Sequence, residues 1–523
     1  MTQARRSPAR LGLWLLLILA LLALGAAAAY LYWREVLLVR PDQALVAQLQ
    51  SAGQSLPPVD LTPAFPGAEG AGSLTPGGRG GQVIEVTNLN DSGPGSLRQA
   101  VDTPGPRIVV FRVGGVIELE RPIRIREPYL TLAGQTAPGG GITLSGKQNQ
   151  DGELFILQDV HDVVIRFLRF RNGGDGEPGH GQINIAIDSG THDIVIDHVS
   201  LSWTLDENLM IHRNIPDGED PAGWPEIYNL TLQWSLIAEG LSPHSTGTQI
   251  GGEAEVDGWQ GVHDITLHHN LYAHNSHRNP GVGSLRTQVI NNVVYNWSPR
   301  VGSTWRNIDV DWIGNYFKAG PMSDPDSLLV HVAFPRDRPD QPWPMPSLYV
   351  AGNLAPPGRR NPEGDNWDMY RLHYINQPLP QEFRRSQPLS TAGLPVSLQP
   401  AAEAYENVLI GAGASARLGC SEGWVYNPDA VDRRLVEEVR RGEGPDKQPP
   451  AHENEVGGFA PVEPGEPCPD GDHDGMPDAW EALASLDPRR DDSAGYALHD
   501  RYTNLEVYLN GMVLPSQAVE ASR

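Results

Sequence analysis

The chain has 523 residues, a formal net charge of −25 at neutral pH and a hydrophobic fraction of 39%, which is typical of a globular protein that buries a core. Its 57 glycines and 46 prolines are scattered without a fixed period, so collagen is excluded and many turns are indicated. The acidic balance argues against a nucleic-acid partner, and a polyanionic substrate would need a local basic cleft or bound cations. Cys420 and Cys468 are the only cysteines, so the sequence has no disulfide framework but permits one bridge in an oxidising compartment.

The first predicted element is an uncharged apolar segment over 11–33, which follows Arg5, Arg6 and Arg10. At ~1.5 Å per residue a helix of this length crosses a bilayer, and the preceding arginines keep the N-terminus inside. We therefore predict a cytoplasmic N-terminus and transmembrane signal anchor over 1–33, followed by a spacer over 34–62. The alternative is a cleaved signal peptide, for which "GAAAAY" supplies small residues. Both interpretations export the remainder to the periplasm or the extracellular space.

From about residue 160, short β-branched strands alternate with polar corners at a period of about 22 residues, and no helical periodicity intervenes. This pattern predicts an all-β fold, a right-handed parallel β-helix over 63–355, in which stacked rungs bury a shared core. A loop-rich extension over 356–465 is predicted to wrap or cap this solenoid, and 466–523 forms a small tail. Asparagines at equivalent corners are expected to hydrogen-bond along the stack and to carry no chemistry; they are Asn270, Asn292, Asn315 and Asn353.

Seven blocks of sequence, in order along the chain, are characteristic; they are "AFPGAEGAG" (64–72), "GGRGGQVIEVTNLNDSGPGSLRQAV" (77–101), "LTLAGQTAPGGGITLSG" (130–146), "IDHVSLSWTLDEN" (196–208), "HNSHRNPG" (274–281), "DHDGMPDAWE" (472–481) and "YTNLEVYLNG" (502–511). Together they resemble the bacterial secreted pectate lyases. The resemblance implies a parallel β-helix, calcium dependence and eliminative cleavage of polygalacturonate, and therefore a polysaccharide lyase.

Eliminative cleavage requires that the uronate carboxylate be neutralised, that a base take the C5 proton and that the leaving oxygen be protonated. Calcium can neutralise the carboxylate and takes oxygen ligands, so grouped protein carboxylates are expected. Asp197, Asp206 and Glu207 supply such a group, and strand alternation turns Asp197 outward onto a groove surface if Ile194 and Ile196 face inward. The alternative is that Asp197 caps a turn and that the other two are solvated acids.

Arg278 matches the arginine that serves as the base in the "HRNP" block of the family. A guanidinium normally stays protonated, so this role requires neighbouring cations and limited solvation to lower its pKa. The alternative is an ordinary surface ion pair. His274 and His277 are candidates either to hydrogen-bond sugar hydroxyls or to serve as structural corner residues.

Three positions depart from the family pattern. Asn184 stands where the family often has an aspartate, and its carbonyl oxygen would be a weaker calcium ligand. Gly283 takes the place of a second arginine, for which Arg286 and Arg300 are candidate replacements in binding a substrate carboxylate, and 242–252 lacks a lysine. These losses thin the positive charge of the predicted groove. They leave open a lyase for a different uronate polymer, and an exported β-helix that binds acidic polysaccharide with little or no catalysis.

The tail contains "DGDHDGMPDAWE", which fits a calcium-loop pattern with acidic residues at positions 1, 3, 5, 9 and 12 and a glycine at position 6. Pro477 is unusual in an EF-hand, so the loop looks closer to the secreted calcium-repeat type. We predict a structural calcium site, with a flexible acidic loop as the alternative; its ligands would be Asp470, Asp472, Asp474, Asp478 and Glu481. The predicted protein is thus a membrane-anchored monomer whose partners are Ca²⁺ and a pectate-like polysaccharide.

Overall fold

The computed structural model describes residues 61–149, 151–173, 182–215, 219, 223–251, 261–305, 308–323, 330–333, 346–355, 366–372, 377–390 and 392–512. Residues from Thr62 onward form one compact unit. Within the described part of the chain, no helix combines the length and apolar character needed to cross a bilayer. The predicted anchor over 11–33, and the spacer up to residue 60, lie outside the described residues.

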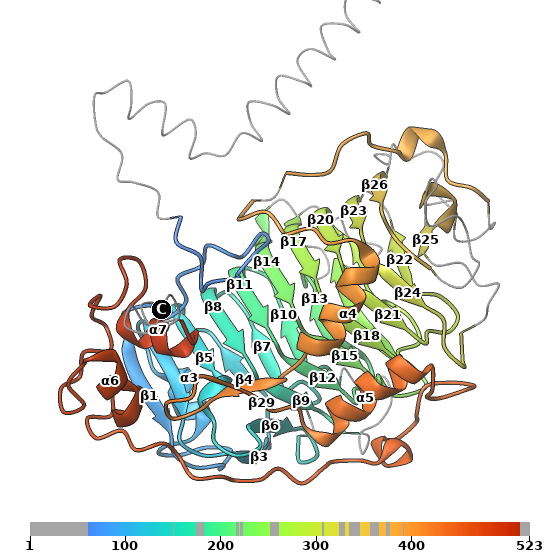
Figure 1. The fold of residues 1–523 in the computed structure, drawn as a ribbon. Helices are drawn as coiled ribbons and strands as arrows, with labels where there is room; N and C mark the ends of the chain where they lie inside the picture. The colour runs from blue at the N-terminus through green and yellow to red at the C-terminus, as the bar shows by residue number, and fades with distance from the viewer. Residues whose placement is uncertain are drawn as a thin grey trace, which may run out of the picture. The chain divides into compact units, whose positions relative to one another are not determined.

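Three parallel sheets dominate the unit (Figure 1). The first sheet contains, in spatial order, β1 (Gln82–Val86), β2 (Arg107–Phe111), β5 (Leu130–Ala133), β8 (His161–Arg166), β11 (His192–Asp197), β14 (Ile227–Gln233), β17 (Val262–His268), β20 (Leu285–Ile290), β23 (Asp309–Ile313) and β26 (Ser347–Ala351). The second contains β3 (Gly115–Glu118), β6 (Ile142–Ser145), β9 (Arg169–Arg171), β12 (Ser200–Ser202), β15 (Leu236–Ala238), β18 (Leu271–Ala273), β21 (Val293–Tyr295) and β24 (Tyr316–Lys318). The third contains β4 (Ile123–Ile125), β7 (Phe155–Leu157), β10 (Ile185–Ile187), β13 (Glu207–Ile211), β16 (Thr246–Gly251), β19 (Gly281–Gly283), β22 (Gly302–Trp305), β25 (Val330–Ala333) and β27 (Tyr370–Leu372).

Successive strands of the chain go to successive sheets, so that β11, β12 and β13 make one rung and β14, β15 and β16 the next. The predicted parallel β-helix is therefore confirmed. The solenoid continues beyond the predicted end at residue 355, because β27 still pairs with β25 in parallel register.

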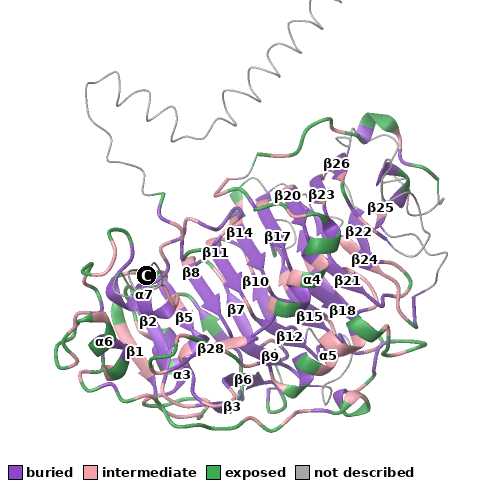
Figure 2. Cartoon of the chain, in the orientation of Figure 1, coloured by how far each residue is buried: buried purple, intermediate pink, exposed green. Residues whose placement is uncertain are grey.

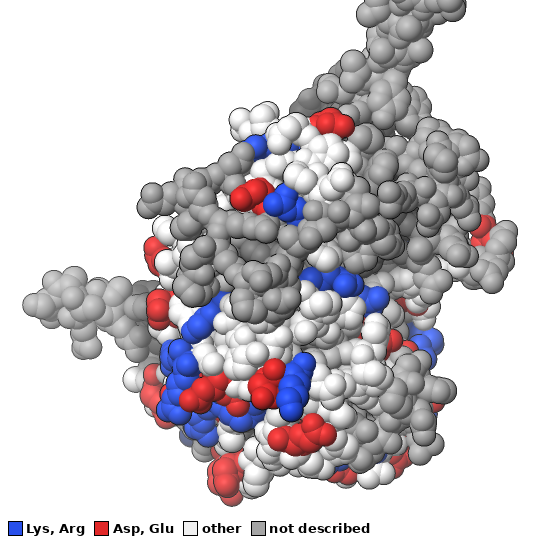
Figure 3. All heavy atoms as spheres, turned by 90° about the vertical axis from the view of Figure 1, so that its right-hand side faces the viewer, with Lys and Arg blue, Asp and Glu red and all other residues white. Residues whose placement is uncertain are grey.

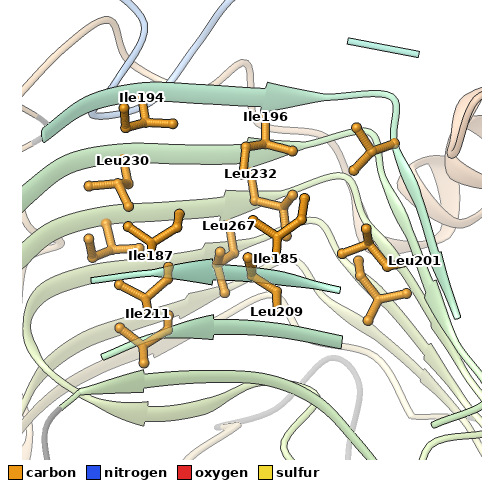
Figure 4. Close-up of a cluster of buried hydrophobic side chains, with 14 of the residues drawn as sticks. Ile185, Ile187, Ile194, Ile196, Leu201, Leu209, Ile211, Leu230, Leu232 and Leu267 are labelled. Atoms are coloured by element: carbon orange, nitrogen blue, oxygen red, sulfur yellow. The ribbon is translucent and has the colours of Figure 1, made fainter. Parts of the chain in front are cut away.

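The core lies between the three sheets, where aliphatic side chains from alternate strand positions meet (Figure 4). Ile194 and Ile196 of β11 face inward, as do Leu209 and Ile211 of β13. Each rung thus contributes a layer of aliphatic side chains to one continuous core. Burying each such side chain contributes roughly 1.5–3 kcal/mol, and stacking rungs makes that burial possible.

The predicted asparagine ladder is present at the corner between the first and second sheets. Asn270 Nδ2 donates to Asn292 Oδ1 (2.9 Å), Asn292 Nδ2 donates to Asn315 Oδ1 (3.1 Å), and Asn315 Nδ2 donates to Asn353 Oδ1 (2.9 Å). Asn366 continues the ladder, because its Oδ1 accepts a hydrogen bond from Asn353 Nδ2 (3.3 Å). Their structural role is confirmed, because these amides satisfy one another and the buried corner backbone.

Outside the sheets are several short helices. Within the described residues, the α-helices are α3 (Leu97–Asp102), α4 (Ala401–Gly411), α5 (Ala430–Arg441), α6 (Asp478–Ala484) and α7 (Asn504–Leu509), and the 3₁₀ turns are η1 (Gly134–Thr136), η4 (Asn366–Met369), η5 (Gln381–Phe383) and η6 (Glu453–Val456). α4 and α5 cover the outer face of the second sheet, where Leu435 and Val439 of α5 pack near Leu271 and Val293 (Figures 1 and 2). The extension predicted to be loop-rich therefore wraps the solenoid, but it does so with two helices.

The tail packs on the outer face of the first sheet. Met476, Trp480 and Leu505 form a buried cluster with Ile108 and Val110 of β2. A hairpin of β28 (Ala416–Leu418) and β29 (Trp424–Tyr426) lies before α5, and a disulfide between Cys420 and Cys468 joins it to the tail. The acidic tail segment is therefore attached to the solenoid by apolar packing and by a covalent bridge.

The glycine-rich segment over 62–81 also lies on the outer face of the first sheet. The amide of Gly72 donates to Thr231 Oγ1 (3.0 Å), and a Cβ on Gly72 would come within 2.1 Å of the carbonyl oxygen of Ile194. The amide of Ala71 donates to Thr266 Oγ1 (3.1 Å). The glycines allow the backbone to approach the sheet closely, so this segment covers strands that would otherwise face water.

Candidate functional site

The polar corner between the second and third sheets gathers charged side chains from successive rungs. Glu207 opens β13 in register with Thr246 of the next rung, and Thr246 bridges to His277 of the rung after that. The β-helix therefore places residues that are tens of positions apart in sequence in one line. We call this group the Arg278 corner; it consists of Asp206, Glu207, His244, His277, Arg278 and Arg300.

Arg278 is a largely enclosed cation of this corner. Its Nη1 donates to Glu207 Oε1 in an ion pair, and the two side chains are 24% and 4% exposed. Burial lowers the pKa of the Arg278 guanidinium; the carboxylate of Asp206 opposes this change, whereas the positive charge of Arg300 adds to it. Limited solvation and a second cation are the two conditions under which a guanidinium loses its proton more readily.

Two histidines flank Arg278. His244 Nδ1 lies 2.7 Å from Asp206 Oδ1, and this hydrogen bond raises the pKa of His244. The ring of His277 lies edge-on to that of His244, with 5.8 Å between centroids. Burial, with the charges of Arg300 and His244, lowers the pKa of His277 to about 4. His277 is therefore neutral near pH 7 and can exchange hydrogen bonds with a hydroxyl group.

The corner thus offers two adjacent carboxylates, two arginines and a neutral imidazole. Asp206 and Glu207 now interact with His244 and Arg278, and both carboxylates could instead bind a cation. Calcium takes six to eight oxygens, so two carboxylates would be a partial set that a ligand and water complete. Such a set suits a cation that bridges the protein and an anionic ligand.

Asp197 does not belong to this corner. It ends β11, whereas Asp206 and Glu207 precede β13, so β12 stands between them. Its carboxylate is fully buried and accepts hydrogen bonds from Arg166 Nε (2.7 Å) and Gln233 Nε2 (2.8 Å). The prediction that Asp197 lies on a groove surface with the other acids is therefore wrong. Its side chain does point outward from the first sheet, as strand alternation predicted.

The reason is the segment that covers the first sheet. Arg166, the partner of Asp197, lies over the ring of Phe65 (3.7 Å to the centroid), and Gln233 donates to the carbonyl oxygen of Gly67 (3.1 Å). Burial raises the pKa of Asp197, but His198 and Arg166 outweigh this effect and hold the pKa well below its usual range. Asp197 is thus an ionised structural residue.

Three other predicted residues also do not join this charged group. Asn184 is buried in a second amide stack, where its Nδ2 donates to Asn208 Oδ1 (2.9 Å), so its amide does not face a groove. His274 is buried with Nε2 3.1 Å from Glu438 Oε2 of α5, which matches the structural alternative. Arg286 belongs to β20 of the first sheet, where its Nε donates to Asp264 Oδ1 (2.8 Å). Arg300 is therefore the predicted carboxylate-binding arginine that the fold brings to Arg278.

The acidic tail loop converges as the sequence predicts, with one exception and one addition. Two sets of carboxylates each have one oxygen per residue within 4.8 Å of the others; they are Asp470, Asp472 and Asp474, and Asp474, Glu481 and Asp492. Burial and neighbouring carboxylates raise the pKa of Asp474 to about 7 and that of Glu481 to about 8. A grouping of this kind is costly unless a cation lies between the carboxylates.

Asp478 is the exception in the tail loop. It is the first residue of α6, and its Oδ1 accepts a hydrogen bond from the amide of Gly471 (2.7 Å). In this position Asp478 closes the loop through a backbone hydrogen bond and belongs to neither set. The prediction of Asp478 as a ligand therefore does not match its geometry.

Two residues of these groups were not predicted. His244 lies in "SPHSTG", which contains nothing that indicates a site until the rungs are stacked. Asp492 belongs to "RRDDS", which reads as a solvated acidic turn, and its approach to Asp474 depends on how the chain returns after α6. Both residues reach these groups only through tertiary contacts.

One face of the molecule is drawn with its charged residues in Figure 3. Among the described residues of that face, basic and acidic side chains are interspersed, and neither sign covers a broad area. A polyanionic ligand on that face would depend on individual arginines and bound cations, because no extended basic surface is available there.

No protein-family model matches the chain. The chain is 35% identical over 459 residues to a probable pectate lyase C of Aspergillus fumigatus, covering 86% of this chain and 94% of that relative. It is also 35% identical over 460 residues to a probable pectate lyase C of Aspergillus flavus, covering 87% and 95%. Among solved structures it is similar to Jun a 1, the major allergen from cedar pollen, with 16% identity over 66% of this chain and 92% of that chain and a TM-score of 0.48. It is likewise similar to a pectate lyase bound to hexasaccharide, with 15% identity over 68% of this chain and 99% of that chain and a TM-score of 0.47.

These curated relatives are fungal, so the bacterial part of the expected resemblance is not confirmed. The resemblance to pectate lyases is itself confirmed by the extent of the match, which spans nearly the whole of each relative. The chain belongs to the pectate lyase family and is a polysaccharide lyase.

Proposed function

We propose that this protein cleaves polygalacturonate, or a related uronate polymer, by calcium-assisted β-elimination with Arg278 as the base. The observation that carries the proposal is the state of Arg278: a largely enclosed guanidinium with a lowered pKa, next to Arg300 and paired with Glu207. An ordinary surface arginine has neither the burial nor the neighbouring cation.

Asp206 and Glu207 are the residues that would hold the calcium ion. When bound, the ion would neutralise the uronate carboxylate next to C5 and so make the C5 proton more acidic. Carboxylate oxygens of the polymer would complete the ligand set that two protein carboxylates leave partial.

Glu207 has two alternative partners in this arrangement, the cation and Arg278. When Glu207 turns to the cation, Arg278 loses its counter-ion while Arg300 remains beside it, so the pKa of Arg278 falls further. Its neutral form can then accept the C5 proton; the C4–C5 double bond forms as the C4–O bond breaks, and water protonates the leaving oxygen. The ion pair seen between Arg278 and Glu207 is thus the resting form of the base.

Arg300 and His277 have supporting roles in this proposal. Arg300 lowers the pKa values of both Arg278 and His277, and its charge also suits a second uronate carboxylate. His277 stays neutral near pH 7 and can hydrogen-bond a sugar hydroxyl. Both residues therefore orient the polymer, and the proton transfer belongs to Arg278.

The tail is proposed to hold structural calcium, with Asp470, Asp472, Asp474 and Glu481 as ligands. Glu481 is fully buried with both carboxylate oxygens lacking a hydrogen-bond partner among the described residues, which fits a cation site. The protein is further proposed to act outside the cytoplasm, anchored by 11–33 or released after signal cleavage. The disulfide between Cys420 and Cys468 supports an oxidising compartment.

The test is the ultraviolet absorbance of the unsaturated product, followed with the full chain, polygalacturonate and CaCl₂, and then with excess chelator. We expect a calcium-dependent rise, which Arg278→Ala lowers by ~10²–10⁴-fold because a general base is lost. The matched control is Arg441→Ala, at an exposed arginine that ends α5, which should leave the rate unchanged. A folded wild-type chain that binds the polymer without releasing product would instead support a binding protein, and product from another uronate polymer would identify a different substrate.

A further inference from the structure

We propose that the tail binds two divalent cations, held in adjacent sites that share the carboxylate of Asp474. This inference rests on the proposed calcium loop but goes beyond it, because the loop pattern accounts for one ion. The first site is formed by Asp470, Asp472 and Asp474, and the second by Asp474, Glu481 and Asp492.

The spacing of the oxygens fits one ion in each set. Oxygens bound to one calcium ion at 2.3–2.6 Å lie at most about 5 Å apart across the ion. In each of the two sets, the candidate oxygens lie within 4.8 Å of one another. Asp474 belongs to both sets, and a carboxylate with two oxygens can bridge two ions.

Each set also contains its own carboxylate that lacks protein partners. Both oxygens of Asp472 are buried without a hydrogen-bond partner among the described residues, and the same holds for both oxygens of Glu481. Glu481 is fully buried, and its carboxylate lies among those of Asp474 and Asp492. A buried carboxylate without a hydrogen-bond donor is strongly disfavoured unless a cation replaces the lost water. Each set contains one such carboxylate, so each set requires a cation of its own.

The charge of the group points the same way. The two sets together contain five carboxylates, and one divalent cation offsets two of these charges. Arg112 offers a nearby positive charge, with Nη1 3.5 Å from Asp470 Oδ2 in the first set. Repulsion between the carboxylates of the second set would then remain. A second divalent cation between Glu481 and Asp492 would remove most of it.

Asp492 gives the second site a structural consequence. The amide of Asp492 donates to Asp474 Oδ2 (3.3 Å), and Asn504 Nδ2 donates to the carbonyl oxygen of Asp492 (2.9 Å). Asn504 begins α7, and Asn510, the residue that follows α7, accepts a hydrogen bond from Arg166 Nη1 of the solenoid (2.8 Å). An ion in the second site would therefore connect α7 to the proposed calcium loop.

The test counts the calcium ions bound by the full chain, by equilibrium dialysis against CaCl₂, with thermal unfolding as a second readout. Asp472→Asn should remove one ion relative to wild type, and Asp492→Asn should remove one. The variant that combines both substitutions should remove two, and so should Asp474→Asn. Asp500→Asn, at an exposed aspartate in the same tail, should remove none. Any ion bound at the Arg278 corner is present in every variant and cancels.

If the combined variant loses only one ion, the two sets hold a single cation and the inference is overturned while the proposed calcium loop stands. If Asp474→Asn binds as many ions as wild type, the tail holds no calcium, and both the loop and the inference fail. Glu481→Gln serves as an independent probe of the second site if Asp492→Asn does not fold, and it should also remove one ion.

Discussion

Replacing Asp197 by asparagine should lower the stability of the protein without changing the calcium requirement of catalysis. The Asp197 carboxylate is fully buried and accepts hydrogen bonds from Arg166 Nε (2.7 Å) and Gln233 Nε2 (2.8 Å). Removing one partner of a buried ion pair costs about 3–5 kcal/mol. Asparagine keeps the shape and one acceptor oxygen, so we expect a loss of about 2–3 kcal/mol in the free energy of unfolding.

This stabilisation should depend on pH in a defined direction. Burial raises the pKa of Asp197, but His198 and Arg166 more than reverse this effect, so the folded-state pKa lies below that of the unfolded chain, ~3.9. The contribution is therefore fully present above that value and is lost as the pH falls through the folded-state pKa. The difference between wild type and Asp197→Asn should be constant near neutral pH and should shrink in strong acid.

Urea unfolding measures the free energy of unfolding. The rate of product absorbance at increasing CaCl₂ concentrations measures the calcium requirement of catalysis. Glu207→Gln is the matched comparison, because it also neutralises a buried acid but acts at the Arg278 corner. It should raise the calcium concentration for half-maximal rate about tenfold or more if the lost charge weakens binding by ~1.4 kcal/mol. The reasoning is refuted if Asp197→Asn unfolds like wild type but needs more calcium.

Three further predictions concern stability. Burial lowers the pKa of His263, but hydrogen bonds to Asp264 and Glu226 raise it overall, so its stabilising contribution is complete below ~6.5 and is lost as pH rises through the folded-state pKa. The difference in urea-unfolding free energy between wild type and His263→Gln should accordingly fall as the pH rises above ~6.5, and a flat difference contradicts this assignment. Replacing Cys420 and Cys468 by serine should cost about 4 kcal/mol for a 48-residue separation, measured as a shift in thermal midpoint, and no shift would mean that the bridge adds nothing. Asn292→Ala, in the middle of the asparagine ladder, should cost about 2–4 kcal/mol with kcat unchanged, because the buried groups that it satisfies lose their partner; a loss of kcat at full stability would contradict the structural role.

Local patterns in the sequence were sufficient for the solenoid and for part of the site. The strand period and the corner asparagines predict stacked rungs, since residues one period apart become neighbours. The same stacking, together with the family blocks, groups Arg278 with Asp206, Glu207 and Arg300. Helix α5 was missed although its signals are visible, with Asp429 as N-cap and Gly442 after the last turn, because its apolar face has no partner until the second sheet exists.

The sequence by itself determined the repeating strands, the position of Arg278 in its rung and the acidic spacing of the tail loop, because these depend on periodicity and on neighbours along the chain. The tertiary structure alone decided what covers each outer face. Alternation correctly turned Asp197 outward, but only the folded chain places Phe65 and Gly67 above its partners and so makes it structural. Asp492 joins the acidic tail loop in the same way, because contacts between distant segments carry no periodic trace in the sequence.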